Sequence, residues 1–413
     1  MSNRTDLAQF LSSSPWTRRS LLGLGAGAAL AGLTACANDE KKPGPTATSI
    51  VDSLVEPTQA VPTPTQPPIA SPVPGYLDPA RWKGRSITVA SAAIGTYLDA
   101  LTEAYFTAFA GATGATIHHT QFGRDGIASL TDQIDDGAVI WDVVLVPTDN
   151  VLPLSQKGQL TAIDYNIVDP AALYPEIAMQ HGVGQAIYST TIVYPAQAPV
   201  SPTSWKDFWD LSTFAGTRAM MKDPVGTLEF ALLADGVTVA QLYPLDTLRA
   251  FASLAKIREA TIFYEDSKQP VELVRTGQVG LASAWSVRTD LPDVASLVKS
   301  LWNGGMLSAD SWAIPKGAAN ADVAMSFINF ATRSVPAASF SRLQPFGPVN
   351  KNAFALLRPD VVAGLPNAPQ NIGGQFFANW SYWAGKQAEL TKQFNEWLLS
   401  PLATPVPAAS PTA

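Results

Sequence analysis

The chain has 413 residues, of which 46% are hydrophobic and 15% are charged, and its formal net charge at pH 7 is −7. This composition is typical of compact globular proteins, and the acidic balance argues against a nucleic-acid-binding surface, which is usually basic. Cys36 is the only cysteine, so the chain can form no internal disulfide and no cysteine-ligated zinc site.

The N-terminal stretch predicts an export signal. Arg18 and Arg19 precede a short apolar run, and a twin-arginine pair there is typical of proteins exported after folding. The run ends in Leu-Thr-Ala-Cys36, which resembles a bacterial lipobox, where cleavage before the cysteine leaves a diacylated N-terminus. The alternative is a transmembrane anchor, but the 16 residues from 20 to 35 fall short of the roughly 20 that a spanning helix needs. We therefore expect a twin-arginine lipoprotein signal peptide over 1–35 and lipidation at Cys36.

A proline-rich segment follows the predicted lipidation site. Residues 36–79 contain ten prolines and few large apolar side chains, a composition that favours extended, semi-rigid conformations. At ~3 Å per residue it could reach on the order of 100 Å. We expect a linker that tethers a globular body to the outer face of the cytoplasmic membrane. The tail 401–413 has the same composition and is expected to be disordered.

The remaining body, roughly residues 80–400, is longer than one hydrophobic core usually serves, so two lobes are expected. Short β-branched or aromatic runs alternate with helical patterns, which predicts an α/β fold with parallel or mixed sheets covered on both faces. Strands are expected at Ser86–Ser91, Thr116–Phe122, Ile140–Val146, Tyr188–Tyr194, Thr217–Met221, Thr261–Glu265, Val279–Trp285 and Ser311–Ile314. Helical spacing is seen over Tyr97–Ala110, at Leu248, Phe251 and Ala255, and at Val323, Phe327 and Phe330.

Ligands in such sheets bind beyond the carboxyl ends of strands. The loops expected to matter are therefore 92–96, 147–150 and 222–227. Enzymatic motifs are missing from the sequence: it has no His-Glu-x-x-His, no Gly-x-Ser-x-Gly and no phosphate-binding glycine loop. His118 and His119 are adjacent, so on a strand they point to opposite faces and cannot ligate one metal together. We expect no catalytic residues, no metal and no cofactor.

Several blocks of sequence together resemble the family 1 extracellular solute-binding proteins of ABC importers, and within them the spermidine/putrescine-binding type. The blocks are Pro-Thr-Ser-Trp-Lys-Asp-Phe-Trp-Asp (202–210), Phe-Ala-Gly-Thr-Arg (214–218), Trp-Asn-Gly-Gly (302–305), Asp-Ser-Trp-Ala-Ile-Pro-Lys-Gly-Ala (310–318), Phe-Gly-Pro-Val-Asn-Lys (346–351), Tyr-Trp (382–383) and Phe-Asn-Glu-Trp-Leu (394–398). The resemblance covers residues 84–400.

The resemblance implies a two-lobed fold of the periplasmic-binding-protein-like II type, with a ligand cleft between lobes and two chain crossings. The crossings are expected near Tyr188–Tyr194 and Ala284–Arg288. Lobe I is then expected to span 80–188 and 286–335, and lobe II 189–285 and 336–400.

In function, the resemblance implies a monomeric binding lipoprotein that captures a small organic solute by lobe closure and delivers it to a membrane permease. It implies no nucleic-acid partner. The alternative is an exported hydrolase or cofactor-dependent protein that uses the same cleft.

Polyamine-binding members use aromatic side chains against a methylene chain and carboxylates for ammonium groups. Tyr97 is an aromatic near the matching place in the first lobe. Asp223 lies in a loop that is acidic in the family. Thr227 stands at a position where a Glu is expected. Trp285 matches the family tryptophan, and Asp310 matches an acidic position. Core packing is the alternative for Tyr97 and Trp285.

Arg288 departs from the polyamine pattern, because putrescine-type members have an Asp there. A guanidinium presents five donors in a planar fork suited to a carboxylate or phosphate, so an anionic or zwitterionic solute is expected if Arg288 contacts it. The alternative is a structural ion pair with Asp290 or Asp310. Hydroxyl candidates for ligand contact are Thr148, Ser189, Thr190 and Thr191, although hydroxyls on a strand commonly pair across strands instead.

Overall fold

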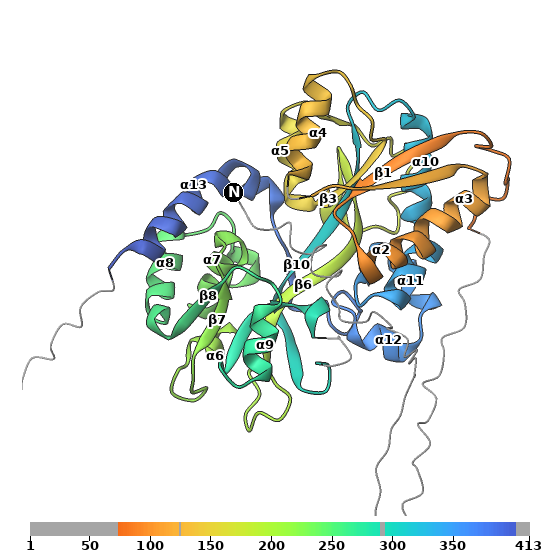
Figure 1. Ribbon diagram of the computed structural model, residues 1–413. Coiled ribbons are helices and arrows are strands. Elements are labelled where there is room, and N and C mark those ends of the chain that lie inside the picture. Colours follow the sequence, from red (N-terminus) through yellow and green to blue (C-terminus); the bar gives the residue numbers. More distant parts are fainter. Residues whose placement is uncertain (1–72, 124, 290–293, 402–413) are drawn as a thin grey trace, which may run out of the picture. The chain divides into compact units, whose positions relative to one another are not determined.

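The structure is a computed structural model that describes residues 73–123, 125–289 and 294–401 (Figure 1). The predicted signal peptide, Cys36, most of the linker, Asp290 and nearly all of the C-terminal tail lie outside the described residues. In the part that is described, no helix combines the length and the apolar character needed to cross a membrane.

A mixed sheet runs through the described residues in the order β2-β1-β3-β10-β6-β9-β7-β8. β1 is parallel to β2 and β3, and β7 is parallel to β8 and β9, whereas β10 is antiparallel to both β3 and β6. The strands of this order are β1 (Ser86–Ser91), β2 (Thr116–Gln121), β3 (Val143–Pro147), β6 (Gly182–Pro195), β7 (Arg218–Met221), β8 (Thr261–Tyr264), β9 (Leu281–Trp285) and β10 (Val298–Pro315). Short strands pair at its margins: β4 (Leu160–Thr161), β5 (Ala178–Met179), β11 (Gly347–Pro348) and β12 (Phe376–Phe377).

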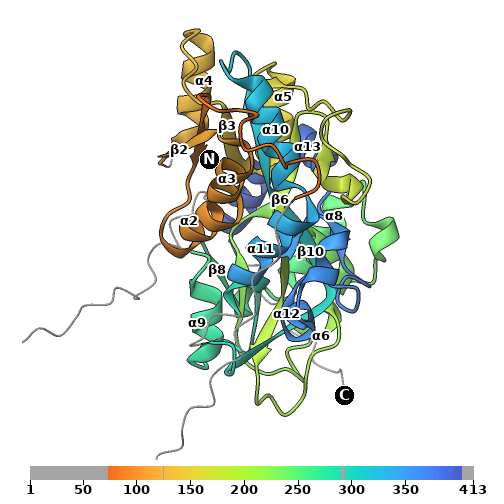
Figure 2. The same cartoon turned by 90° about the vertical axis from the view of Figure 1, so that its right-hand side faces the viewer.

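Helices flank the sheet (Figures 1 and 2). The α-helices are α2 (Gly95–Leu101), α3 (Ala108–Thr113), α4 (Gly126–Asp135), α5 (Thr148–Gln156), α6 (Trp205–Trp209), α7 (Pro224–Ala234), α8 (Thr247–Ala255), α9 (Gln269–Arg275), α10 (Ala321–Ala331), α11 (Ser334–Leu343), α12 (Pro359–Gly364) and α13 (Trp380–Leu399). A π-helical turn, η1 (Thr102–Thr107), joins α2 to α3. The remaining short helices are 3₁₀ turns: η2 (Pro175–Ile177), η3 (Val239–Gln241), η4 (Arg258–Ala260), η5 (Ser286–Arg288) and η6 (Lys351–Leu356).

The buried side chains form two large hydrophobic clusters, and both include residues of the long strands β6 and β10. Tyr105, Phe109 and Phe327 belong to one large cluster, and Trp205 and Trp383 belong to another. We call the elements around the first cluster (β1–β5, α2–α5, α10–α12 and β11) the first lobe. The elements around the second (β7–β9, α6–α9 and α13) are the second lobe. β6 and β10 run side by side from one lobe into the other, as both views show.

The packing favours lobe boundaries that differ from those expected. Val287, directly after β9, belongs to the first core cluster, but Val294 and Val298 pack with Ala282 and Ala284 of β9, so β10 begins in the second lobe. The return to the first lobe is then made along β10. The segment 334–372 packs mainly in the first lobe, where Phe340 contacts the ring of Tyr97. The last boundary is therefore better placed near residue 372 than after 335.

The strands predicted from sequence are present, with ends that differ by a few residues, except that β6 and β10 are much longer than expected. Their extra length follows from burial on both sides, since almost every residue of Gly182–Pro195 is buried. The helix predicted around residue 248 is α8, but its buried face was wrongly placed. Leu248 is 85% exposed, and the buried face carries Ala250, Ser253 and Leu254.

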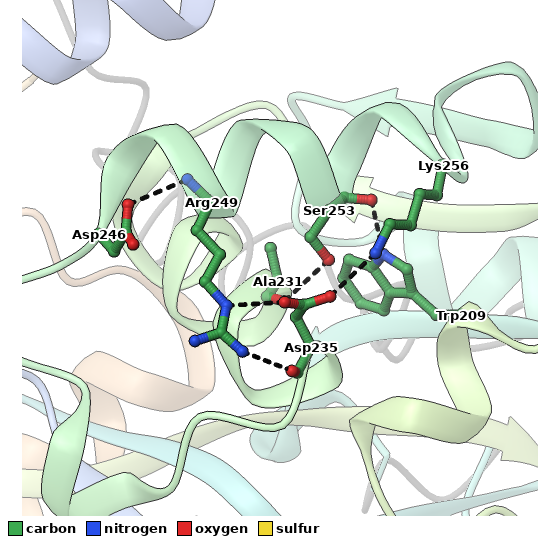
Figure 3. Close-up of polar contacts among 7 residues, drawn as sticks. All are labelled: Trp209, Ala231, Asp235, Asp246, Arg249, Ser253 and Lys256. Carbon is green, nitrogen blue, oxygen red and sulfur yellow. Dashed lines mark hydrogen bonds and ion pairs between the residues drawn. The ribbon is translucent and has the colours of Figure 1, made fainter.

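The orientation of α8 is set by its contacts with α7 (Figure 3). Asp235, at the end of α7, accepts hydrogen bonds from Arg249 Nε at 2.7 Å and Lys256 Nζ at 2.9 Å. Between them, Ser253 Oγ donates to the carbonyl of Ala231 at 2.9 Å. These contacts turn Leu248 to the solvent, which the hydrophobic spacing alone could not indicate.

Candidate ligand-binding site

A small cavity with a volume of about 20 Å³ lies where the two core clusters meet. Tyr188 and Trp285 belong to the first cluster, and Val225, Phe230 and Met306 to the second. The whole lining consists of Tyr188, Thr190, Met221, Val225, Thr227, Phe230, Ser283, Trp285, Met306 and Ser308. The cavity therefore lies between the two lobes.

The three central strands form one wall of this cavity. Thr190 on β6 lies opposite Met306 on β10 and opposite Trp285 on β9, and Tyr188 lies opposite Ser308. Because alternate residues of a strand share a face, these side chains point to the same side of the sheet. The ring of Tyr188 packs against that of Trp285 with centroids 5.5 Å apart.

The start of α7 forms the opposite wall, and it is kinked. Val225 and Gly226 have non-helical backbone angles, with φ of +83° at Gly226. A side chain at Gly226 is disfavoured by this positive φ, and its Cβ would lie only 3.2 Å from both Met306 Cε and Phe230 Cε2. Asp223 Oδ1 accepts from the Val225 amide at 2.9 Å, so this candidate ligand residue caps the helix.

Arg288 lies in the 3₁₀ turn η5, directly after Trp285 and β9. It is 1% exposed, its Nη2 donates to Ser267 Oγ at 2.7 Å, and its Cζ lies 5.5 Å from the Trp285 ring centroid. Among the described residues no ion pair joins Arg288 to Asp310, one of the two structural partners that the sequence left open. The other, Asp290, lies outside the described residues.

Asp310 is a buried carboxyl group in the first lobe. It follows Ser308 by two residues on β10 and so lies on the same face of the strand. The hydroxyl of Tyr97 donates to Asp310 Oδ2 at 3.3 Å and to Gln185 Oε1 at 3.1 Å. Burial, opposed by this hydrogen bond and reinforced by nearby Asp149, raises the pKa of Asp310 to about 7.

The remaining hydroxyl candidates divide by strand face. Thr190 lines the cavity, whereas Ser189 points to the other face and donates to Gln375 Oε1 at 2.6 Å. Thr191 shares that second face and is fully buried. Thr148 Oγ1 lies 2.6 Å from both the Ala309 carbonyl and Ser311 Oγ, so it ties α5 to β10.

The structure thus places three of the ten predicted ligand residues in the cavity lining: Thr190, Thr227 and Trp285. Arg288 lies over Trp285 of the lining, and Asp310, which Tyr97 contacts, is two residues from Ser308. Thr148, Ser189 and Asp223 make other contacts, and Thr191 is buried on the opposite face of β6. Sequence reasoning missed Tyr188, Met221, Val225, Phe230, Ser283, Met306 and Ser308. The alternation of residues along β6 and β10 could have indicated Tyr188 and Ser308, but the α7 residues leave no such signal. No group of metal-ligating side chains occurs within the described ranges.

Comparison with known proteins identifies the chain. Residues 104–370 match the model of a family described as bacterial extracellular solute-binding protein. The chain belongs to this family. It is 31% identical over 326 residues to the γ-aminobutyric acid-binding protein of Pseudomonas aeruginosa, which covers 77% of this chain and 92% of that protein. It is 26% identical over 258 residues to the spermidine/putrescine-binding periplasmic protein of Escherichia coli, covering 59% of this chain and 73% of that protein.

Solved structures of this solute-binding family have the same fold. The GABA receptor Atu4243 aligns with a TM-score of 0.70 and 31% identity over 78% of this chain and all of that one. The protein AgtB of A. tumefaciens R10, solved with agropinic acid, aligns with a TM-score of 0.62 and 28% identity over 77% of this chain and 99% of that one. The two-lobed fold and the solute-binding role for an ABC importer are thereby confirmed, and the alternative of an exported hydrolase is not supported.

Proposed function

We propose that this protein is the receptor of an ABC importer for a short ω-amino acid such as γ-aminobutyrate, which it captures without chemical change. The observation that carries the proposal is a pair of opposite charges at the two ends of a row of aromatic side chains. Arg288 is at one end, in the loop that follows Trp285, and Asp310 is at the other, in the first lobe.

The row can be followed contact by contact. Arg288 lies over Trp285, whose ring packs on Tyr188, and Tyr188 contacts Phe346 with centroids 6.3 Å apart. Phe346 in turn packs at 5.5 Å on Tyr97, whose hydroxyl reaches Asp310. Opposite charges separated by apolar surface match a solute with a carboxylate, a methylene chain and an ammonium group.

Each end of such a solute has a suitable partner. The Arg288 guanidinium can bind a carboxylate through two parallel hydrogen bonds, and Asp310 can accept from an ammonium. The Trp285 and Tyr188 rings can cover the methylene groups. The likeness to two γ-aminobutyric acid-binding proteins supports this assignment.

A polyamine is the second candidate, because the chain is 26% identical to a spermidine/putrescine-binding protein, and its sequence resemblance to polyamine-binding members places Trp285 and Asp310 at matching positions. A second ammonium group would then lie near Arg288. The Coulomb repulsion in a buried site disfavours this arrangement.

Calorimetry with γ-aminobutyrate, putrescine and spermidine tests the proposal. Replacement Arg288→Ala should weaken γ-aminobutyrate binding by ~1.5–3 kcal/mol, the scale of a hydrogen bond to a charged group. Arg249→Ala is the matched control, because Arg249 forms a surface ion pair with Asp235. Preferential binding of putrescine that survives Arg288→Ala would refute the ω-amino acid assignment.

We also propose where the receptor works. The twin-arginine signal over 1–35 would export the folded chain, and diacylation of Cys36 would anchor it through the proline-rich linker. The family role implies permease subunits as its protein partners, and we expect a monomer. The absence of catalytic motifs in the sequence supports a binding protein that is not an enzyme.

A further inference from the structure

Glu229 is a buried carboxylate that no part of the proposed solute contact uses. It is fully buried in the first turns of α7, two residues after Thr227 of the cavity lining. Its Oε2 accepts from the Gly226 amide at 2.9 Å, and its Oε1 accepts from Tyr243 Oη at 2.6 Å and from Trp383 Nε1 at 2.7 Å. All three donors are neutral, and burial raises the pKa of the Glu229 carboxyl.

Burying a carboxylate costs free energy, and the three hydrogen bonds to Glu229 offset part of that cost. Each donor comes from a different segment of the second lobe. Gly226 is the kink of the cavity wall, Tyr243 precedes α8, and Trp383 is in the first turn of α13. The Tyr243 hydroxyl also accepts from the Asn379 amide at 3.3 Å, next to the start of α13. Glu229 is thus the point at which the cavity wall is joined to α13.

α13 also contacts the first lobe. It packs against α5 of the first lobe. A groove with a volume of about 500 Å³ lies beside this contact, and its lining includes Leu152 of α5, Tyr243 and Trp380 of α13. Movement of one lobe against the other would therefore alter the packing of α13 on α5.

We propose that Glu229 is a positioning residue for solute binding: it holds the cavity wall at Val225–Thr227 in its binding geometry only when α13 is seated. The inference rests on the cavity being the solute site, as proposed above. By this route the contact between the lobes at α13 and α5 controls the shape of the cavity. The coupling runs through two hydrogen bonds to one carboxylate oxygen and a third to the other.

Replacement Glu229→Gln tests the coupling. A glutamine has one carbonyl oxygen and an amino group, so it cannot accept from all three donors, and the Gly226 amide or the Tyr243 and Trp383 pair loses its acceptor. We expect the affinity for γ-aminobutyrate to fall roughly ten-fold in the folded variant, measured by calorimetry well below its unfolding midpoint. Asp235→Asn, at the other end of the same helix (Figure 3), should leave the affinity unchanged.

Two further variants, Trp383→Phe and Tyr243→Phe, remove hydrogen-bond donors to Glu229. They test the coupling between α13 and the cavity wall even if Glu229→Gln does not fold. Each should weaken γ-aminobutyrate binding, and Trp383→Phe combined with Glu229→Gln should weaken it by less than the sum of the two, as expected for one connected network. Trp383→Phe should also speed hydrogen exchange at the amides of residues 225–228 without any solute.

The outcomes separate this inference from the proposed function. Wild-type affinity in Glu229→Gln and in both Phe variants, with lower unfolding midpoints only, would show a purely structural role and overturn the inference. Unchanged exchange at residues 225–228 in Trp383→Phe would overturn it as well. Trp285→Ala with wild-type affinity would instead overturn the assignment of the cavity, and the inference with it.

Discussion

Asp310 shows how one residue can be destabilising in the free protein and useful in the complex. Its carboxyl is buried in the first lobe, near Asp149, with the Tyr97 hydroxyl as a donor. Burial favours the neutral acid, while a bound ammonium group would favour the carboxylate. Sites of this kind are common where proteins bind charged ligands, because strain in the free state is released by the ligand.

This burial predicts the pH dependence of the ligand-free protein. The pKa of Asp310 is about 7 in the folded state against an ordinary value of 3.8, so between these values the folded state holds the proton that the unfolded state has lost. Stability should therefore fall as pH rises from about 4 to about 7, by on the order of a few kcal/mol. Asp310→Asn should remove this part of the slope in urea unfolding at pH 4–8. The pKa of Glu229 is also raised, so it lowers stability with rising pH in both wild type and variant. If stability falls equally steeply with pH in the two proteins, the prediction for Asp310 is wrong.

At the scale of elements, β10 is interrupted where it passes between the lobes. Its register with β6 shifts between Leu301 and Met306, and Gly304 in this interval has φ of +76°. The Gly304 carbonyl accepts from Trp205 Nε1 at 2.8 Å, and its amide donates to the Gly374 carbonyl at 2.9 Å. A bulge of this kind bends a strand and gives a defined point about which the lobes can turn.

Gly304→Ala should therefore destabilise the protein by ~2–4 kcal/mol, because an alanine combines an unfavourable positive φ with a clash. The added Cβ would lie 2.7 Å from Trp205 Cδ1. Gly137→Ala is the matched control: φ is +66° there, but nothing lies within 4 Å of the added Cβ, so only about 1 kcal/mol should be lost. Denaturant unfolding of both variants measures the difference, and equal losses would show that the Trp205 contact is unimportant.

At the scale of the described body, the lobes are joined by β6, by β10 and by the segment that leads into β12. Gln375 links this third connection to β6, because it accepts a hydrogen bond from Ser189 Oγ at 2.6 Å. It also donates to the Pro366 and Asn371 carbonyls at 2.7 and 2.6 Å. Ser189, predicted as a ligand residue, thereby contacts a connection between the lobes. Few covalent links and an interlobe cavity favour a hinge motion.

We expect the lobes to close on the solute. Small-angle scattering should show a smaller radius of gyration at saturating γ-aminobutyrate, and hydrogen exchange should slow at the residues of the cavity wall. The hinge is expected at β6, as the sequence indicated near 188–194, and at the β10 bulge of residues 302–305 in place of the predicted 284–288, because β10 makes the second crossing. Superimposable scattering profiles with and without solute would disprove closure.

Anchoring of the whole chain should depend on Cys36. Cys36→Ser removes the sulfur that would carry the diacylglycerol, and without that second chain membrane binding is marginal at best. The variant should therefore leave the membrane fraction after its signal is processed. A matched Arg18→Lys and Arg19→Lys pair should instead block export and leave Cys36 unlipidated. A processed Cys36→Ser protein that stays with the membrane would disprove the lipobox assignment.

The sequence by itself determined most of the elements and the family. Strand β1 coincides with the predicted Ser86–Ser91, because a strand is recognised from the residue types of a few consecutive positions. The blocks around Trp205 and Asp310 were enough to predict the family, the two lobes and an interlobe site. Arg288 was enough to predict that the solute is not a simple diamine, a hypothesis that calorimetry can now test.

The tertiary structure alone decided which side chains meet. Periodicity tells that Ser189 and Thr190 point to opposite faces, but only the position of α7 makes the face of Thr190 the one that borders the cavity. In the same way, only the packing of α13 on α7 brings Trp383 to Glu229, which is 154 residues away in the chain. Contacts between distant segments depend on how whole elements pack, and no local pattern of residues encodes that packing.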